Sequence, residues 1–211
     1  INEFGQKKFL DKNFVDTLGQ HIFTYYILGE YSLDEDENFL IRFYEKTSSN
    51  LKSWVNLFNY VGACLCRDGE ALEKDLVERC KNYFEWRLEI SDQEELSTFF
   101  SWLSAKCLSE KWRLENYSKI LDISPRKGGG IMSELRAINN LLLENTPLVV
   151  ECFAKITDSI EPSENYYIQS EIGKDIINEG LHSNDNTVVE NAERARENLL
   201  RLGRFDFLDL E

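Results

Sequence analysis

Apolar residues recur at helical spacing along most of this chain. The clearest example is the stretch from Phe39 to Leu65, in which two apolar stripes are separated only by Ser48, Ser49 and Asn50. This pattern predicts two amphipathic helices joined by a very short turn. Such a hairpin cannot bury both apolar faces by itself, so it needs further helices stacked on it. The two stripes consist of Phe39, Leu40, Phe43 and Tyr44, and of Leu51, Trp54, Val55, Phe58, Val61 and Leu65.

Further helical stripes lie on both sides of this hairpin. We expect an earlier helix within residues 9–28 and later helices that continue to Gly203. Period-two alternation, which is typical of strands, is found only in the tail after Gly203, and this tail is too short to carry a sheet. The residues expected to begin helices are Ser91, Ser109, Thr146 with Pro147, Pro162 with Ser163, and Asp185 or Asn184, and those expected to end helices are Gly180 and Gly203.

The fold class predicted from this pattern is all-α. About ten helices follow one another in pairs at a pitch of roughly 40 residues, in the range of HEAT-like and armadillo-like repeats. We therefore expect antiparallel helical hairpins stacked as a HEAT-like α-solenoid, with a compact multi-helix bundle as the alternative. Residues 1–211 would form a single domain with a sub-boundary at 124–130. Because the chain begins with Ile1 and not with Met, we expect it to be a fragment of a larger protein.

Composition narrows the class of protein further. Apolar residues make up 42% and charged residues 29% of the chain, as in soluble globular proteins. The formal net charge of −14 argues against binding to nucleic acid or to an anionic membrane surface. No apolar run reaches the roughly 20 residues of a membrane span, and no signal peptide opens the sequence. We expect a cytoplasmic protein whose cysteines are reduced and buried.

No residue pattern in the chain completes a catalytic or metal-binding motif. The acidic run Asp34–Glu37 lacks the spacing of a calcium loop and is better explained by the start of a helix. Cys64 and Cys66 would point to opposite sides of a helix and could not chelate one metal ion together. The glycine run after Arg126 and Lys127 has the wrong order for a P-loop, which makes a linker more plausible than an anion cradle. We therefore expect no cofactor and no bound metal.

Four aromatic residues are the candidates for a partner-binding surface. Trp86 and Trp112 lie beside charged positions, so they are the weakest assignments to the core among the tryptophans. Phe205 and Phe207 belong to an apolar tail that follows the last predicted helix. This tail would fold back over the end of the helical stack, or it would dock on another domain or chain.

The chain also shows a resemblance to a known family. Its pattern of apolar residues is similar to that of the C-terminal helical regions of large bacterial STAND-type P-loop NTPases. The resemblance implies a sensor or scaffold of the kind found in prokaryotic antiviral defence, with the NTPase itself outside this chain because no Walker motif is present. The similar segments are Tyr26–Glu30, Asp36–Lys46 with its run Phe39–Tyr44, the helix that ends near Gly62, and Ala192–Leu200 followed by Gly203–Phe207.

Three hypotheses about function follow. The first is a non-enzymatic helical-repeat module that binds a protein partner or another domain of its parent chain. The second is an enzyme or small-ligand binder whose site brings a cysteine together with His21 or His182. The third is an oligomerisation domain.

Overall fold

The described part of the chain is entirely helical. The structure, a computed structural model, describes residues 51–68, 72–90, 93–124 and 130–210, and within these ranges it contains helices and turns but no strand. The all-α prediction is therefore confirmed for this part of the chain. The helix expected within residues 9–28, the first helix of the Phe39–Leu65 hairpin, the acidic run Asp34–Glu37 and His21 lie outside the described residues, as does the glycine-rich segment 125–129.

The helices follow one another with short connections. In chain order they are α3 (Leu51–Asp68), α4 (Lys74–Ile90), α5 (Gln93–Leu96), α6 (Phe100–Leu103), α7 (Glu110–Ile123), α8 (Gly130–Asn139), α9 (Thr146–Ser159), the 3-10 helix η3 (Pro162–Tyr167), α10 (Ser170–Leu181), α11 (Asn186–Arg201) and the 3-10 helix η4 (Phe205–Phe207). None of the described helices is both long enough and apolar enough to cross a membrane.

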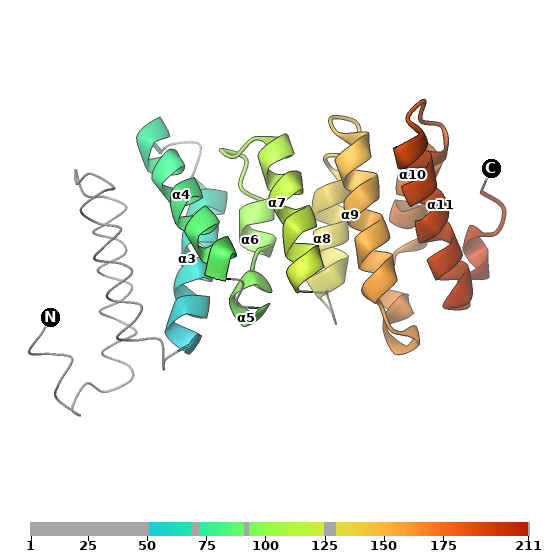
Figure 1. The fold of residues 1–211 in the computed structure, drawn as a ribbon, viewed down its shortest axis with the longest axis horizontal. Coiled ribbons are helices and arrows are strands. Elements are labelled where there is room, and N and C mark those ends of the chain that lie inside the picture. The colour runs from blue at the N-terminus through green and yellow to red at the C-terminus, as the bar shows by residue number, and fades with distance from the viewer. Residues whose placement is uncertain (1–50, 69–71, 91–92, 125–129, 211) are drawn as a thin grey trace, which may run out of the picture.

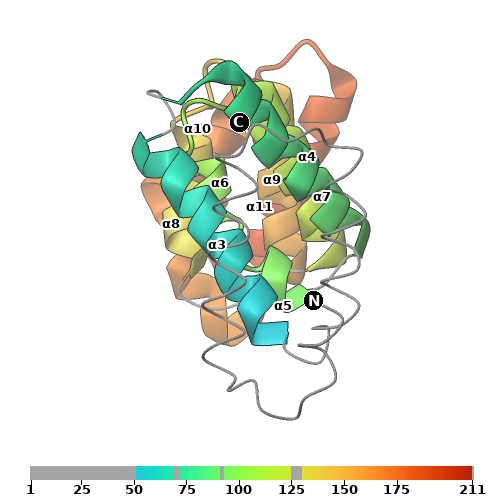
Figure 2. The same ribbon diagram turned by 90° about the vertical axis from the view of Figure 1, so that its left-hand side faces the viewer.

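These helices form a row in which spatial order follows chain order. Figure 1 shows the row from α3 at one end to α10 and α11 at the other. One layer contains α3, α6, α8 and α10, each packed on the next, and α5 packs on α3 within it. The second layer contains α7, α9 and α11, again packed in sequence, with α4 beside α7 in the view along the row (Figure 2). Apart from α5 and α6, which share a layer, consecutive α-helices alternate between the two layers, and the apolar faces of both layers meet in one continuous core.

The core is aromatic toward α3 and aliphatic toward α11. Phe58, Phe84 and Trp102 lie within 5.7 Å of one another between ring centroids. Phe99 extends this cluster, with its ring centroid 5.1 Å from that of Phe84. These rings are at most 1% exposed. Around α9, α10 and α11 the buried positions include Val149, Val150, Ile156, Ile176, Ile177, Ala192, Ala195 and Leu199, with Phe153 among them.

The contact between α3 and α6 depends on a glycine. Gly62 lies against the Trp102 indole, so closely that a Cβ at residue 62 would be 2.5 Å from Cδ1 of that ring. The indole Nε1 donates a hydrogen bond to the Phe58 carbonyl at 3.0 Å, which also fixes the orientation of the ring. Trp102 is fully buried, so it has no room to move aside.

A buried ion pair joins α4 to α5. The Arg87 guanidinium donates two hydrogen bonds to the Glu95 carboxylate, one of them from Nε at 2.6 Å and the other from Nη2. Both side chains are at most 1% exposed. Removal of one partner from a buried pair of this kind leaves an uncompensated charge in the core. The ion pair therefore fixes how α5 is positioned relative to α4.

Several predicted helix ends are confirmed. The Ser109 side chain accepts a hydrogen bond from the Trp112 backbone N–H at the start of α7, and Asp185 accepts one from Thr187 at the start of α11. Gly203 follows Leu202, the C-cap of α11, and has a φ of +83°, the left-handed conformation that ends many helices.

Other predicted ends were met only in part. The helix start predicted at Thr146 and Pro147 is confirmed, but Thr146 was also expected to be the cap and is not, because its hydroxyl donates to the Leu142 carbonyl behind it and Asn145 occupies the cap position. Pro162 begins the short 3-10 helix η3 and not an α-helix. Gly180 lies within the last turn of α10, where a Cβ would be 2.7 Å from the Ala192 Cβ, so this glycine permits close packing of α10 on α11.

Replacement of Gly62 by Ala tests the α3–α6 contact. Overpacking of a fixed core site costs about 1–3 kcal/mol, against which alanine gains up to about 1 kcal/mol in helix propensity. We expect Gly62→Ala to lower the free energy of unfolding by about 1 kcal/mol or more in urea titrations. The neighbouring exposed substitution Ala63→Ser should change it by less than about 0.5 kcal/mol. An unchanged or higher stability of Gly62→Ala would show that the contact is not tight.

Candidate functional site

Phe205 and Phe207 lie on opposite sides of the C-terminal tail. The Phe207 ring is fully buried over Gly173, where a Cβ would be 2.8 Å from the ring. Phe205, two residues earlier, is 71% exposed. The expectation that the tail folds back over the end of the helical stack is therefore met by Phe207. Only Phe205 has a ring available to a partner, and Phe207 is removed from the candidate surface because its ring fills the space above Gly173.

Arg204 holds the tail in this position. Its Nη1 donates to the carbonyls of Asn165 at 2.8 Å and Ile168 at 2.7 Å, and its Nη2 donates to the Ser170 hydroxyl at 2.8 Å. Nε and Nη2 also contact the Asp206 carboxylate, both at 3.0 Å. Hydrogen bonds from this guanidinium lower the pKa of Asp206 from its ordinary value of 3.8 to about 2. Arg204 therefore joins the tail to the segment that runs from η3 to the first residue of α10.

Trp86 and Trp112 are mainly core residues. Each is partly buried and packs against the core. The Arg87 guanidinium lies over the Trp86 ring at 4.9 Å from its centroid, and the Tyr83 ring lies 6.1 Å away. Trp112 meets Phe84 edge to face at 5.0 Å, which joins α7 to α4. Both rings thus have structural contacts that account for much of their surface.

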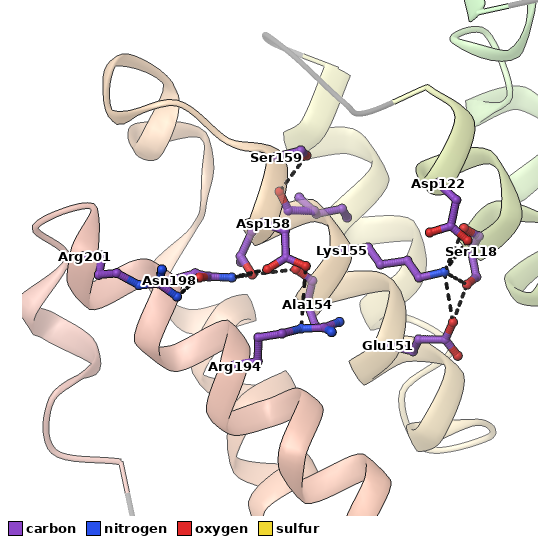
Figure 3. A network of polar contacts seen from close by, with 12 residues as sticks. Ser118, Asp122, Glu151, Ala154, Lys155, Asp158, Ser159, Arg194, Asn198 and Arg201 are labelled. Carbon is purple, nitrogen blue, oxygen red and sulfur yellow. Dashed lines mark hydrogen bonds and ion pairs between the residues drawn. The ribbon is translucent and has the colours of Figure 1, made fainter.

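A polar cluster that the sequence did not reveal lies between α7 and α9 (Figure 3). Lys155 Nζ is 2.8 Å from the Ser118 hydroxyl, 2.7 Å from the Asp122 carboxylate and 3.2 Å from the Glu151 carboxylate. The Ser118 hydroxyl donates in turn to Glu151 at 2.5 Å. The serine is almost fully buried, whereas Asp122 is largely exposed.

A serine beside a lysine is the arrangement of some hydrolases, in which a neutral lysine takes the serine proton. Here burial would lower the pKa of Lys155, but hydrogen bonds to Asp122 and Glu151 outweigh this effect and raise it above its ordinary 10.5. The amine is therefore charged at neutral pH and is a poor base. We interpret the cluster as a link between α7 and α9.

A second polar cluster connects α9 to α11 in the same layer. Asn198 Nδ2 donates to the Asp158 carboxylate, Arg194 Nε lies 3.6 Å from the same carboxylate, and Arg201 donates to the Asn198 side-chain oxygen. In both clusters a basic residue reaches an acidic residue of the preceding helix in the layer, Lys155 to Asp122 and Arg194 to Asp158. The only sign of these two contacts in the sequence is the separation of the two partners along the chain, which is close to the predicted pitch of the hairpins.

The surroundings of Cys66, Cys80, Cys152 and His182 are described by burial and by contacts to backbone carbonyls. Burial raises the pKa of Cys80 to about 12 and raises that of Cys152 as well. Cys66 is exposed, and its thiol lies 3.8 Å from the Ser104 carbonyl. His182 is exposed at the end of α10, with its Nδ1 2.7 Å from the Asn178 carbonyl. Within the described ranges, no group of three or more His, Cys, Asp or Glu side chains could hold a metal ion.

Comparisons with protein-family models, with curated proteins and with solved structures give no significant match.

We call the contact between Arg204 and the Asp206 carboxylate the tail clamp. It predicts that the stability of the chain depends on pH in a particular way. The folded pKa of Asp206, about 2, lies below its ordinary value of 3.8, so its contribution to stability is fully present above pH 5 and disappears as the pH falls toward 2. Asp206→Asn should lower the free energy of unfolding at pH 7 by no more than about 1 kcal/mol, since the carboxylate is partly solvated. The difference from the unsubstituted chain should shrink steadily between pH 4 and pH 2 in denaturant titrations. Asp209→Asn, an exposed control in the same tail, should show no such trend, and a constant difference for Asp206→Asn would contradict the clamp.

Proposed function

We propose that this chain is a HEAT-like α-solenoid that acts as a scaffold and binds a protein partner. The observation that carries the proposal is the two-layer row of helices, in which α3, α6, α8 and α10 pack on one another in sequence, as do α7, α9 and α11. Such stacks have extended outer surfaces, and repeat proteins use surfaces of this kind for binding. The acid–base contacts from Lys155 to Asp122 and from Arg194 to Asp158 support a repeating unit, because equivalent links join successive pairs of helices.

The resemblance to the helical regions of STAND-type NTPases supports a more specific form of this proposal. In that form the scaffold belongs to a larger NTPase in bacterial antiviral defence and contacts another domain of its parent. The closing segment that contributes to the resemblance, Ala192–Phe207, contains the last turns of α11 and the clamp formed by Arg204. This segment fixes the end of the described stack, a role that suits a terminal repeat.

Phe205 offers a direct test of partner binding. A tagged full-length chain purified from its native host should retain a protein partner in near-stoichiometric amount, measured by quantitative mass spectrometry. Because the Phe205 ring is 71% exposed, Phe205→Asp should leave the fold intact and reduce retention of any partner bound at this end. Leu143→Asp, a similarly exposed apolar site in the turn between α8 and α9, serves as the matched control. Failure of the chain to retain any partner would contradict the scaffold proposal.

Thiol labelling separates the scaffold from an enzyme with a nucleophilic cysteine. We expect Cys66 to react with Ellman's reagent at the rate of an ordinary exposed thiol, and Cys80 and Cys152 to react only after unfolding, because burial keeps both protonated. Cys66→Ser should remove the reaction of an exposed thiol at this position. A single cysteine that reacts much faster than free cysteine at pH 7, and loses this rate in His182→Ala, would instead favour the enzyme.

A further inference from the structure

Three of the cysteines lie close together where α3, α4 and the connection between α6 and α7 meet. Cys64 belongs to α3, Cys80 to α4 and Cys107 to the connection. All three are thiols, of which Cys80 is buried and the other two are partly buried. Burial is the main reason for the raised pKa of Cys80, and electrostatic interactions with Cys107 and then with Cys64 add to it. The three thiols therefore form one cluster.

The packing of the surrounding helices places Cys107 beside both α3 and α4. The Cys107 thiol lies 3.8 Å from the Leu65 carbonyl of α3. Cys80 and Phe84 are four residues apart and both are buried, so they lie on the same side of α4. The Phe84 ring meets the Trp112 ring of α7 edge to face at 5.0 Å. The chain from Cys107 into α7 therefore runs along the side of α4 to which Cys80 belongs.

Arg113 brings a positive charge to this cluster. It is 6% exposed, and its Nη1 donates at 2.9 Å to the Leu103 carbonyl, just before the connection that contains Cys107. Its Nη2 lies 3.9 Å from the Glu110 carboxylate, and its buried Nε has no hydrogen-bond partner among the described residues. Burial lowers the pKa of Arg113, whereas Glu110 and then Cys107 raise it. A neighbouring guanidinium favours the thiolate form of a cysteine, which is the reactive form.

Cys107 and Cys80 differ in what can reach them. Cys107 is only partly buried, so a small dissolved oxidant has access to its sulfur. Cys80 is 2% exposed and burial keeps it protonated, so a dissolved reagent does not meet it as a thiolate. Its reaction partner must belong to the cluster. Cys107 is favoured over Cys64 in this role because its electrostatic effect on Cys80 is the larger of the two.

We propose that Cys107 and Cys80 are a thiol pair that hydrogen peroxide oxidises to a disulfide between α4 and the connection before α7. The Cys107 thiolate attacks one peroxide oxygen, the O–O bond breaks, and the departing hydroxide takes up the proton that Cys107 had released. The product is a sulfenic acid at Cys107. The Cys80 sulfur then attacks the Cys107 sulfur, the S–O bond breaks, and the Cys80 proton leaves with the hydroxide as water.

The two steps balance as a two-electron oxidation of the thiol pair. Two thiols become one disulfide, and one molecule of hydrogen peroxide is reduced to two molecules of water. This inference goes beyond the proposed scaffold function and does not depend on it.

Disulfide mapping of the full chain tests the inference. The reduced protein is treated with hydrogen peroxide at pH 7, the remaining thiols are blocked, and linked peptides are identified by mass spectrometry without reduction. We expect one intramolecular disulfide, between Cys80 and Cys107, with a yield that does not depend on protein concentration. Cys107→Ser should abolish it and leave Cys80 as a thiol. Cys66→Ser, which removes an exposed thiol, is the matched control and should leave the yield unchanged.

Two substitutions test the part played by Arg113. Arg113→Gln should slow the oxidation of Cys107 by about threefold or more. A thiol pKa higher by one unit lowers the thiolate fraction tenfold, and the greater nucleophilicity of a more basic thiolate offsets part of this loss. Glu110→Gln, an exposed change that removes the acidic partner of Arg113, should raise the rate. Because Arg113 is buried, circular dichroism must show that its variant folds, and Glu110→Gln decides the point where it does not.

Other products would overturn the inference. They are a disulfide that includes Cys64 or Cys66, a sulfinic acid at Cys107 with Cys80 still a thiol, and a chain left unoxidised under conditions that oxidise free cysteine. An unchanged rate in Glu110→Gln together with an unchanged rate in a folded Arg113→Gln would overturn the role given to Arg113. Mapping of the unsubstituted chain decides the disulfide even where Cys107→Ser fails to fold.

Discussion

The position of Trp102 against Gly62 sets the geometry of the first part of the described row of helices. The indole occupies the space that a side chain at residue 62 would take, and its N–H is bonded to the Phe58 carbonyl. This contact brings α6 against α3, and Phe84 and Phe99 then fill the space beneath them. One packing constraint therefore determines the aromatic core at this end of the described row.

The second half of the molecule is held by a different kind of interaction. Its core is largely aliphatic, and its helices are joined near the surface by the polar clusters around Lys155 and Asp158. Partly exposed ion pairs contribute little stability individually, so their main effect is to fix how one helix lies on the next. Arg204 has the same effect at the end of the row, where it holds Phe207 over Gly173. Aliphatic side chains account for most of the buried surface in this half, and the polar contacts fix how each helix is positioned along the next.

The sequence was informative where structure depends on neighbouring residues and uninformative where it depends on distant ones. Helical periodicity predicted the all-α class, and the caps Ser109 and Asp185 were predicted because a cap bonds within its own first turn. Thr146 was misassigned because its hydroxyl has a second acceptor in the preceding turn, the Leu142 carbonyl. Lys155 and Asp122 are 33 residues apart, so only the packing of α7 on α9 reveals that they meet. Phe205 and Phe207 looked equivalent in the sequence, and only the folded tail, held by Arg204 and with Phe207 over Gly173, shows that one ring is buried.

A catalytic or metal site requires several groups to converge, and convergence depends on distant contacts that a sequence does not display. Ser118, Glu151 and Lys155 show this, because they meet only where α7 packs on α9. Burial on a single helix is instead a local property. The buried positions of α3, such as Phe58, Val61 and Leu65, are apolar because they face the core, and their helical spacing is visible in the sequence.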